Sequence, residues 1–409
     1  MKSFFKVVDI DTVLSLARSF DVGAVERVAL AAADERVLAE NVQADLDIPG
    51  FSRSTMDGYA VRGASTFGAS EANPAFLRVV GNVAMGAKPA VTVKAGEAVR
   101  IATGGMLPGG SDAVIMIEHT ETIDAETIEV YKSAAPGQHV ISRGEDVRNG
   151  DTVLHRGQPL RPQVVGLLAA VGKTHLDVFT RPRVGILSTG DEVVPVDTTP
   201  GPAQIRDINS VALAALITVA GGIPHPYGIV PDDKDALRAT CHSALQANDM
   251  VLISGGSSVG TRDFTIDVLQ ALEASEILVH GVSIRPGKPT ILARSGGKPV
   301  WGLPGHVTSA MVVFTVLVRP YLEHLGGLDP HYIRRLCVPA RLTRNLPSVQ
   351  GRIDYVRVRL VQGTQGLDAE PVLGKSGLIR TMAAADGLLC IDENTEGLNG
   401  GTVVPVELF

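Results

Sequence analysis

The stretch "MVLISGGSSVGTRDFT", Met250 to Thr265, indicates which fold the C-terminal half of the chain adopts. Four apolar residues run into a turn rich in glycine and serine, and a segment with helical spacing follows. A buried strand that leads through a glycine turn into a helix is typical of a parallel sheet covered by helices. The turn is also suited to an anion, because glycine exposes backbone N–H groups at a helix start. Taken alone, the turn is consistent with both interpretations.

The segments on either side repeat this alternation of strand and helix. We predict strands at "VGIL" (184–187), "PYGIV" (226–230) and "EILVHGV" (276–282), followed by a β pair, "PTILAR" and "KPVWGLP". We predict helices at "NSVALAALITVAG" (209–221), "DKDALRATCHSALQA" (233–247) and "VTSAMVVFTVLVRPYLEHL" (307–325). Strands that alternate with helices indicate a mostly parallel sheet with helices on both faces. In such sheets, ligands bind beyond the carboxyl ends of the strands.

The rest of the chain has a different texture. Residues 9–19 and 24–40 have helical spacing, residues 47–143 hold short β-type runs between glycine and proline turns, and residues 150–172 predict a hairpin and a helix. In "DYVRVRLVQG" (354–363) apolar residues alternate with arginines, which indicates a half-buried strand. We therefore predict a multidomain α/β protein. Its central three-layer α/β domain (181–327) has a mostly parallel sheet, 47–143 form a β-rich inserted domain, 1–46 with 144–180 form a small mixed domain, and 328–409 form a C-terminal β-barrel-like domain.

Composition excludes several classes of function. The net charge is −7 with no basic block, so a nucleic-acid partner is not expected. Three widely spaced cysteines predict neither a disulfide framework nor a thiolate zinc site, and they fit the reducing cytoplasm. The longest apolar run, 307–318, is too short to cross a bilayer, and the N-terminus does not have the pattern of a secretory signal. We expect a cytoplasmic protein with no membrane partner.

Charged side chains follow several of the predicted strands. Glu192, Asp232 and Asp263 supply carboxylates, and Arg285 and Lys288 of "RPGKP" supply positive charge. If the strands are parallel, these loops share one edge of the sheet. Carboxylates beside a phosphate predict Mg²⁺ between them, so the expected ligand is a phosphorylated small molecule. The alternatives are that Asp232 only caps a helix and that "GGSSVG" is a plain turn.

Eight segments occur here in one order: "STMDGYAVR", "RIATGGMLPGGSDAVI", "RGEDV", "ILSTGDEVV", "QIRDINS", "ISGGSSVGTRDF", "RPGKP" and "GLPGHVTSA". Together they resemble the molybdopterin molybdenumtransferase family, which includes the E domain of gephyrin. The resemblance covers essentially the whole chain. It implies an enzyme that inserts molybdate into adenylylated molybdopterin with Mg²⁺, releasing AMP and forming molybdenum cofactor. It also implies a homodimer with a composite active site, and as partners molybdopterin adenylyltransferase and downstream cofactor-maturation proteins.

The resemblance also implies roles for single residues. Those implied as catalytic are Asp57, Thr103, Asp146, Glu192, Asp232 and Asp263, the first three being contributed by the partner chain. Mg²⁺ would be held by Asp263, Asp232 and Glu192. Those implied to bind substrate or oxyanion are Ser188, Thr189, Gly255, Gly256, Ser258, Arg285, Lys288, Pro304, Ser309, Arg352 and Ser376.

The chain departs from the family pattern at two places. Lysine is usual where Arg285 stands, and a planar guanidinium differs in geometry from an ammonium. The usual Asn-Pro is replaced by His306 and Val307. Two alternatives to the enzyme therefore stay open: a weak or inactive dimeric scaffold with the same fold, and a paralogue that handles tungstate.

Overall fold

The computed structural model describes residues 7–255 and 261–409, with the side chains of 261–264 outside that description. The chain forms two compact units. The first contains 1–40, 156–161 and 175–409, and the second contains 41–155 and 162–174. The boundaries of the four predicted domains stay a prediction.

The first unit is built on a six-stranded sheet in the order β16-β13-β17-β21-β20-β18. The strands are β16 (Ile223–Val230), β13 (Arg183–Thr189), β17 (Met250–Ser254), β21 (Lys298–Leu303), β20 (Ile291–Ser295) and β18 (Ser275–His280). The first four run parallel to one another, and β20 is antiparallel to both of its neighbours. The loops that follow β13, β16, β17, β18 and β21 therefore leave the same edge of the sheet, as predicted.

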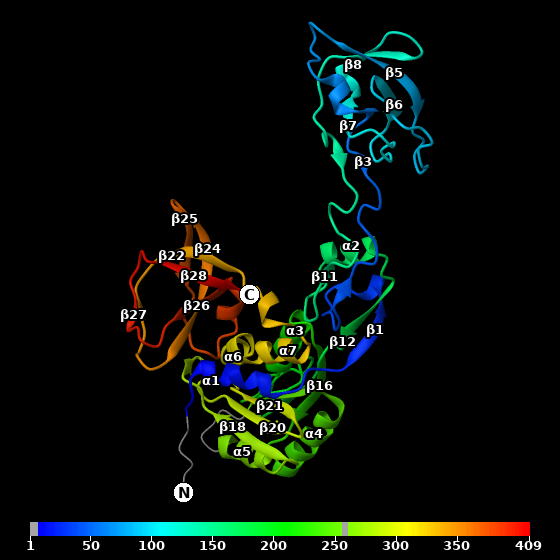
Figure 1. Ribbon diagram of the computed structural model, residues 1–409. Coiled ribbons are helices and arrows are strands. Elements are labelled where there is room, and N and C mark those ends of the chain that lie inside the picture. Colours follow the sequence, from blue (N-terminus) through cyan, green and yellow to red (C-terminus); the bar gives the residue numbers. More distant parts are fainter. Residues whose placement is uncertain (1–6, 256–260) are drawn as a thin grey trace. The chain divides into compact units, whose positions relative to one another are not determined.

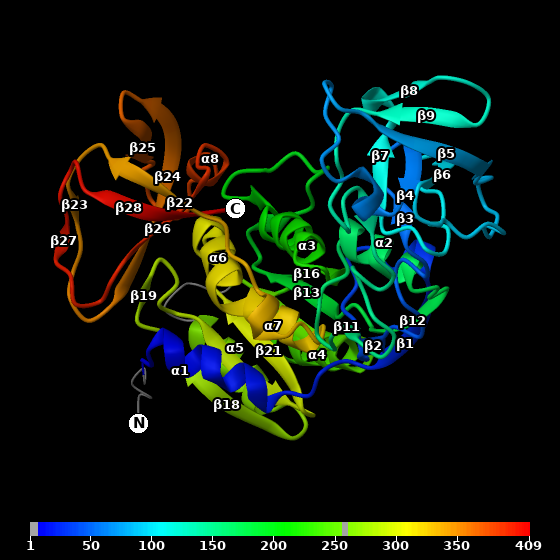
Figure 2. The same cartoon turned by 45° about the horizontal axis from the view of Figure 1, so that its top comes forward.

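Helices cover both faces of this sheet (Figures 1 and 2). On one face lie α1 (Ile10–Ser15), α3 (Asn209–Val219) and a continuous helix made of α6 (Val307–Val313), a π-helical turn (Phe314–Val318) and α7 (Arg319–Leu325). On the other lie α4 (Lys234–Ala247) and α5 (Thr261–Gln270). In β17, Met250 and Leu252 join the core under α3, whereas Val251 and Ile253 join the core under α4. Alternate side chains of one strand point to opposite faces, so a strand buried on both faces is apolar throughout. The predicted three-layer α/β fold is confirmed.

The C-terminal part of this unit is a closed β-barrel. Its strands are β22 (Cys337–Leu342), β24 (Ile353–Gly363), β25 (Gly366–Pro371), β26 (Gly387–Ile391) and β28 (Val403–Leu408). They pair in the ring β24-β25-β22-β28-β26, and β26 pairs again with β24. The short strand β19 (Ile284–Arg285) runs from the loop after β18 and pairs in parallel with β24. This pairing attaches the loop that carries Arg285 to the barrel.

The second unit contains a six-stranded sheet in the order β7-β4-β6-β5-β9-β8. The strands are β7 (Ala113–Met116), β4 (Gly58–Val61), β6 (Glu97–Ile101), β5 (Ala75–Asn82), β9 (Thr127–Val130) and β8 (Thr120–Thr122). Two cores pack on it, one around Val61, Leu77 and Ile128 and the other around Val99, Ile101 and Val114. The unit also contains α2 (Pro162–Ala170), as the periodicity of the sequence predicts.

Two local predictions were wrong. Residues 24–40 have helical spacing but form β1 (Val25–Ala29) and a short 3-10 turn (Leu30–Ala32), and β1 pairs with β12 (His175–Phe179). The expected hairpin after residue 150 is also replaced, because β11 (Thr152–Leu154) pairs with β2 (Val42–Gln43). In both cases a strand from a distant part of the chain satisfies the backbone hydrogen bonds, and such a partner overrides local propensity. Among the described residues, none of the helices combines the length with the apolar character that spanning a bilayer requires.

Candidate functional site

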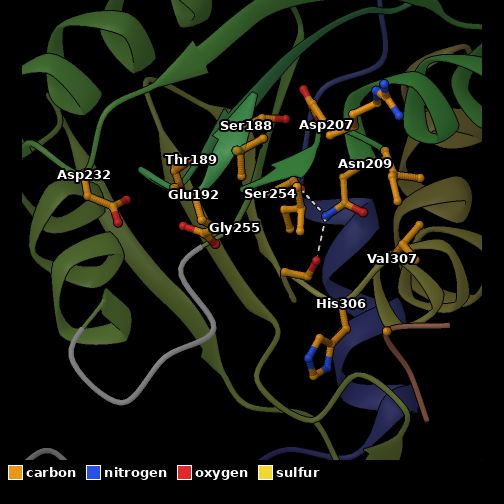
Figure 3. Close-up of a pocket in the computed structure, with 17 residues that line it drawn as sticks. Ser188, Thr189, Glu192, Asp207, Asn209, Asp232, Ser254, Gly255, His306 and Val307 are labelled. Atoms are coloured by element: carbon orange, nitrogen blue, oxygen red, sulfur yellow. Dashed lines mark hydrogen bonds between the residues drawn. The ribbon is translucent and has the colours of Figure 1, made fainter. Parts of the chain in front are cut away.

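A pocket of about 340 Å³ lies where the parallel strands of the first unit end (Figure 3). Residues from four loops of the sheet meet there, together with one residue that follows β25 in the barrel. The lining residues are Ser188, Thr189, Gly190, Glu192, Val193, Ile205, Arg206, Asp207, Ile208, Asn209, Asp232, Ser254, Gly255, Gly305, His306, Val307 and Gly377. Five predicted site residues are thus brought together: Ser188, Thr189, Glu192, Asp232 and Gly255.

The end of β17 and the end of β13 approach each other closely at Gly255. Its φ is +137°, and a Cβ atom added there would lie 2.2 Å from the carbonyl oxygen of Thr189. Only glycine fits this position, because any side chain would collide with fixed backbone. The next residues of the turn, Gly256 and Ser258, lie outside the described residues.

The side chain of Asn209, at the start of α3, connects two loops of the pocket. Its amide Nδ2 donates to Ser254 Oγ at 2.7 Å and to the carbonyl oxygen of Gly305 at 2.9 Å (Figure 3). Neither Asn209 nor its pocket neighbour Asp207 was predicted as a site residue. Both belong to the quoted segment "QIRDINS", so the signal was available in the sequence, but Asn209 looks there like an ordinary helix start.

A buried hydroxyl in this pocket lacks an internal partner. Ser188 is 2% exposed, and within the described part of the chain its Oγ has no hydrogen-bond partner. Burying a hydroxyl without a hydrogen bond costs roughly 1–3 kcal/mol. The pocket wall therefore offers a polar group that a bound ligand would satisfy.

Carboxylates gather on one side of the pocket. Burial, followed by the negative charges of Asp191 and Glu192, raises the pKa of Asp232 above its usual range. The Asp232 backbone N–H donates to Asp191 Oδ1 at 3.2 Å. Like charges held together in this way favour a cation. Among the described side chains no group of three His, Cys, Asp or Glu residues is arranged to hold a metal, and the side chain of Asp263, which lies in α5, is outside that description.

The predicted residue Ser376 does not line the pocket, but it contacts His306, which does. The Ser376 hydroxyl lies 3.0 Å from His306 Nδ1, and the Ser376 carbonyl accepts from the Thr308 N–H at 3.1 Å. Ser376 belongs to the barrel, whereas His306 and Thr308 belong to the loop and helix that follow β21.

A second cluster of predicted residues forms around Asp354. Arg352 Nε donates to Asp354 Oδ1 at 2.8 Å, and Arg285 Nη1 lies 3.6 Å from Asp354 Oδ2. The Asp354 side chain is 6% exposed, while both arginines retain exposed surface. Asp354 was not predicted as a site residue, because nothing in the sequence indicates that a carboxylate would lie beside the two predicted arginines.

Three further predicted residues do not line the pocket. Pro304 is buried directly before Gly305, Ser309 is buried in the first turns of α6, and Lys288 is exposed in the loop before β20.

The remaining predicted residues lie in the second unit. The backbone N–H and the hydroxyl of Thr103 donate to Asp57 Oδ1 at 2.7 and 2.9 Å, and these bonds hold the pKa of Asp57 below its ordinary value. Asp146 is exposed, and its N–H donates to the Ile48 carbonyl at 3.1 Å.

Comparison with known proteins matches three family models along the chain. They are the MoeA N-terminal region (domain I and II) at residues 8–172, the probable molybdopterin binding domain at 185–324 and the MoeA C-terminal region (domain IV) at 339–409. The chain is 33% identical to the molybdopterin molybdenumtransferase of Bacillus subtilis, over 95% of this chain and 90% of the relative. The chain belongs to the MoeA family of molybdopterin molybdenumtransferases.

Other members of the MoeA family are similar to this chain in sequence and in fold over nearly its whole length. Molybdopterin molybdenumtransferase 2 of Mycobacterium tuberculosis is 35% identical, over 93% of this chain and 94% of the relative. A crystal structure of the molybdopterin biosynthesis MoeA protein from Pyrococcus horikoshii superposes with a TM-score of 0.85 at 32% identity, covering 99% of this chain and 100% of that one. The MoeA fold is thereby confirmed for this chain, and the pocket lies within the residues matched by the molybdopterin-binding model, apart from Gly377.

Proposed function

We propose that this protein inserts molybdate into adenylylated molybdopterin, releasing AMP and forming molybdenum cofactor, in a reaction that depends on Mg²⁺. One observation carries the proposal: a pocket in the molybdopterin-binding region combines glycine turns and hydroxyls with paired carboxylates. Glycine turns and hydroxyls suit phosphate oxygens, whereas carboxylates beside a phosphate require a cation. A phosphoanhydride with a bound divalent metal satisfies both sides of the pocket.

Ser188, Thr189 and the turn at Gly255 are proposed to bind the phosphates. The Ser188 hydroxyl lacks a partner among the described residues, and it is available to donate to a phosphate oxygen. Asn209 holds Ser254, the last residue of β17, through the Ser254 hydroxyl. A strand end held before binding loses little freedom when substrate arrives, which favours affinity and orientation.

The donor set around Asp232 fits Mg²⁺. Mg²⁺ typically takes one or two carboxylates together with substrate phosphate oxygens and water. The raised pKa of Asp232 reflects burial and repulsion that a cation would relieve. We propose Asp232 and Glu192 as metal carboxylates, with Asp263 as a third. When bound, Mg²⁺ would offset negative charge that develops on the departing AMP.

The oxyanion is proposed to bind near the barrel. Arg285 and Arg352 lie on the two sides of a single buried carboxylate, Asp354, so the cluster carries more positive than negative charge. We propose that these arginines, with Lys288, hold molybdate by charge. Ser309 and Ser376 are proposed as hydroxyl donors to the same anion.

We further propose a homodimer in which a second copy supplies Asp57, Thr103 and Asp146. Apolar side chains exposed on and beside α3 support such an association, because exposed apolar patches mark interaction surfaces. They are Ile205, Ile208, Val211 and Val219. The substrate would have to be supplied by a molybdopterin adenylyltransferase and the product accepted by cofactor-maturation proteins.

The proposal is tested by incubating the purified protein with adenylylated molybdopterin and Mg²⁺, with molybdate or tungstate added, and measuring AMP and metal-loaded pterin. We expect AMP release that chelation of Mg²⁺ abolishes. Asp263→Ala should abolish it as well, whereas the matched change Asp235→Ala, at an exposed acid of α4 paired with Arg238, should not. The absence of AMP under every condition would favour the inactive scaffold.

A further inference from the structure

His306 occupies a position between the pocket and the barrel. It lines the pocket and is the residue that precedes α6, yet its side chain makes no capping hydrogen bond to that helix. Its Nδ1 instead lies 3.0 Å from the hydroxyl of Ser376. The imidazole is therefore directed to the barrel loop and does not cap the start of the helix.

The backbone on the pocket side of this contact is fixed. The carbonyl oxygen of Gly305, the residue before His306, accepts the hydrogen bond from Asn209 Nδ2 at 2.9 Å. Asn209 in turn is bonded to Ser254 at the end of β17. A continuous chain of contacts thus leads from the end of β17 to the residue that carries the imidazole.

The backbone of the barrel loop is fixed as well. The Ser376 carbonyl accepts from the Thr308 N–H at 3.1 Å. Arg357 donates from Nη2 to the Gly374 carbonyl at 3.0 Å and from Nη1 to Thr381 Oγ1 at 2.8 Å. With both backbones held, the direction of the Ser376 hydroxyl is decided mainly by its partner, His306.

We infer that His306 is a positioning residue that donates from Nδ1 to the Ser376 hydroxyl, so that Ser376 directs its single hydrogen to a tetrahedral oxyanion. A serine hydroxyl has one donor and two acceptor sites, and an anion takes the donor. Nδ1 must then be the ring nitrogen of His306 that carries a hydrogen. The inference rests on the proposed binding of molybdate at Ser376, and it assigns the histidine an effect on oxyanion affinity.

The test measures molybdate binding to the full-length protein by equilibrium dialysis, for the wild type, His306→Leu, His306→Asn, Ser376→Ala and the double variant His306→Leu/Ser376→Ala. Loss of one hydrogen-bond donor predicts that His306→Leu weakens binding by about three- to tenfold. Asparagine can place an amide N–H near the position of Nδ1, so His306→Asn should stay within about twofold of the wild type. The double variant should bind no more weakly than Ser376→Ala, because coupled residues are not additive.

The matched control is His242→Leu, at an exposed histidine of α4 that contacts Gln246 and lies outside the pocket, and it should bind molybdate as the wild type does. Thermal unfolding of each variant confirms that it is folded. Unchanged binding by His306→Leu, additive losses in the double variant, or a wild type that binds no molybdate would each overturn the inference. AMP release, measured in parallel, reports separately on the proposed function: a protein that releases AMP while His306→Leu leaves molybdate binding unchanged keeps the function and loses this inference.

Discussion

Asn209 donates a hydrogen bond from its side-chain amide to the hydroxyl oxygen of Ser254 over 2.7 Å. Because the same amide nitrogen also donates to Gly305, one side chain holds two loops of the pocket. Asn209→Ala should lower the free energy of unfolding by about 1–3 kcal/mol, since it removes both bonds and leaves the 2%-exposed Ser254 hydroxyl without this partner. Urea unfolding measures the change. Ser243→Ala, at an exposed position of α4, serves as control, and equal stability of the Asn209→Ala protein and the wild type would contradict the assignment.

Asp232 should destabilise the protein at neutral pH. Its pKa is raised by burial and by Asp191 and Glu192, so the folded state binds its proton more tightly than the unfolded state does. The stability that protonation contributes is present below the unfolded pKa and is lost as pH rises through the folded pKa. Asp232→Asn should therefore raise the free energy of unfolding at pH 7 by about 0.2–1 kcal/mol, and the gain should vanish on acidification. A stability advantage that does not change with pH would contradict this cause.

Mg²⁺ bound at Asp232 should stabilise the folded protein, whereas the charge of Asp232 alone destabilises it. Wild-type protein is expected to gain thermal stability on addition of millimolar Mg²⁺, because a ligand that binds only the folded state stabilises it. Asp232→Asn should lose most of that gain, whereas Asp235→Asn, at the exposed acid of α4, should retain it. Calorimetric melting with and without Mg²⁺ makes the comparison, and an equal gain in all three proteins would argue against a metal at Asp232.

Loss of the buried Asp354 carboxylate should lower the free energy of unfolding more than loss of a carboxylate from an exposed ion pair does. Asp354→Asn leaves Arg352 and Arg285 without their carboxylate partner, and we expect a loss of about 1–3 kcal/mol. Glu370→Gln removes the partner of Arg359 at an exposed pair and should cost less than about 1 kcal/mol. Chemical denaturation of both variants measures the two losses in the free energy of unfolding. Comparable losses at the two sites would show that burial of Asp354 is unimportant.

Thr103 should control the titration of Asp57. Thr103→Val removes the hydroxyl donor but keeps the backbone donor, which is the larger cause of the lowered pKa. The pKa of Asp57 should therefore rise only part of the way to its ordinary value of roughly 3.9. Thr103→Ser keeps both donors and should leave it unchanged. Carboxyl NMR titration follows the residue directly, and a Thr103→Val protein that titrates as the wild type does would exclude the hydroxyl as a cause.

The pattern of residues is enough to predict the central sheet and the edge at which its loops meet. Apolar runs such as 250–253, buried on both faces, are what a covered parallel strand requires, and parallel strands place the loops with Ser188, Glu192 and Asp232 on one side. The sequence could not predict the structure of residues 24–40, because helical spacing says nothing about a strand partner far along the chain, and β12 supplied one, from Val25↔Phe179 to Ala29↔His175.

Which side chains meet could be learned only from the packing of distant segments. Asn209 contacts Ser254 and Gly305, His306 contacts Ser376, and Arg285 contacts Asp354, in each case across elements that are distant in sequence. Such contacts depend on the register of β19 against β24 and on how α3 packs over the sheet. Local periodicity contains no information on either, since both are set by the burial of side chains from several segments at once.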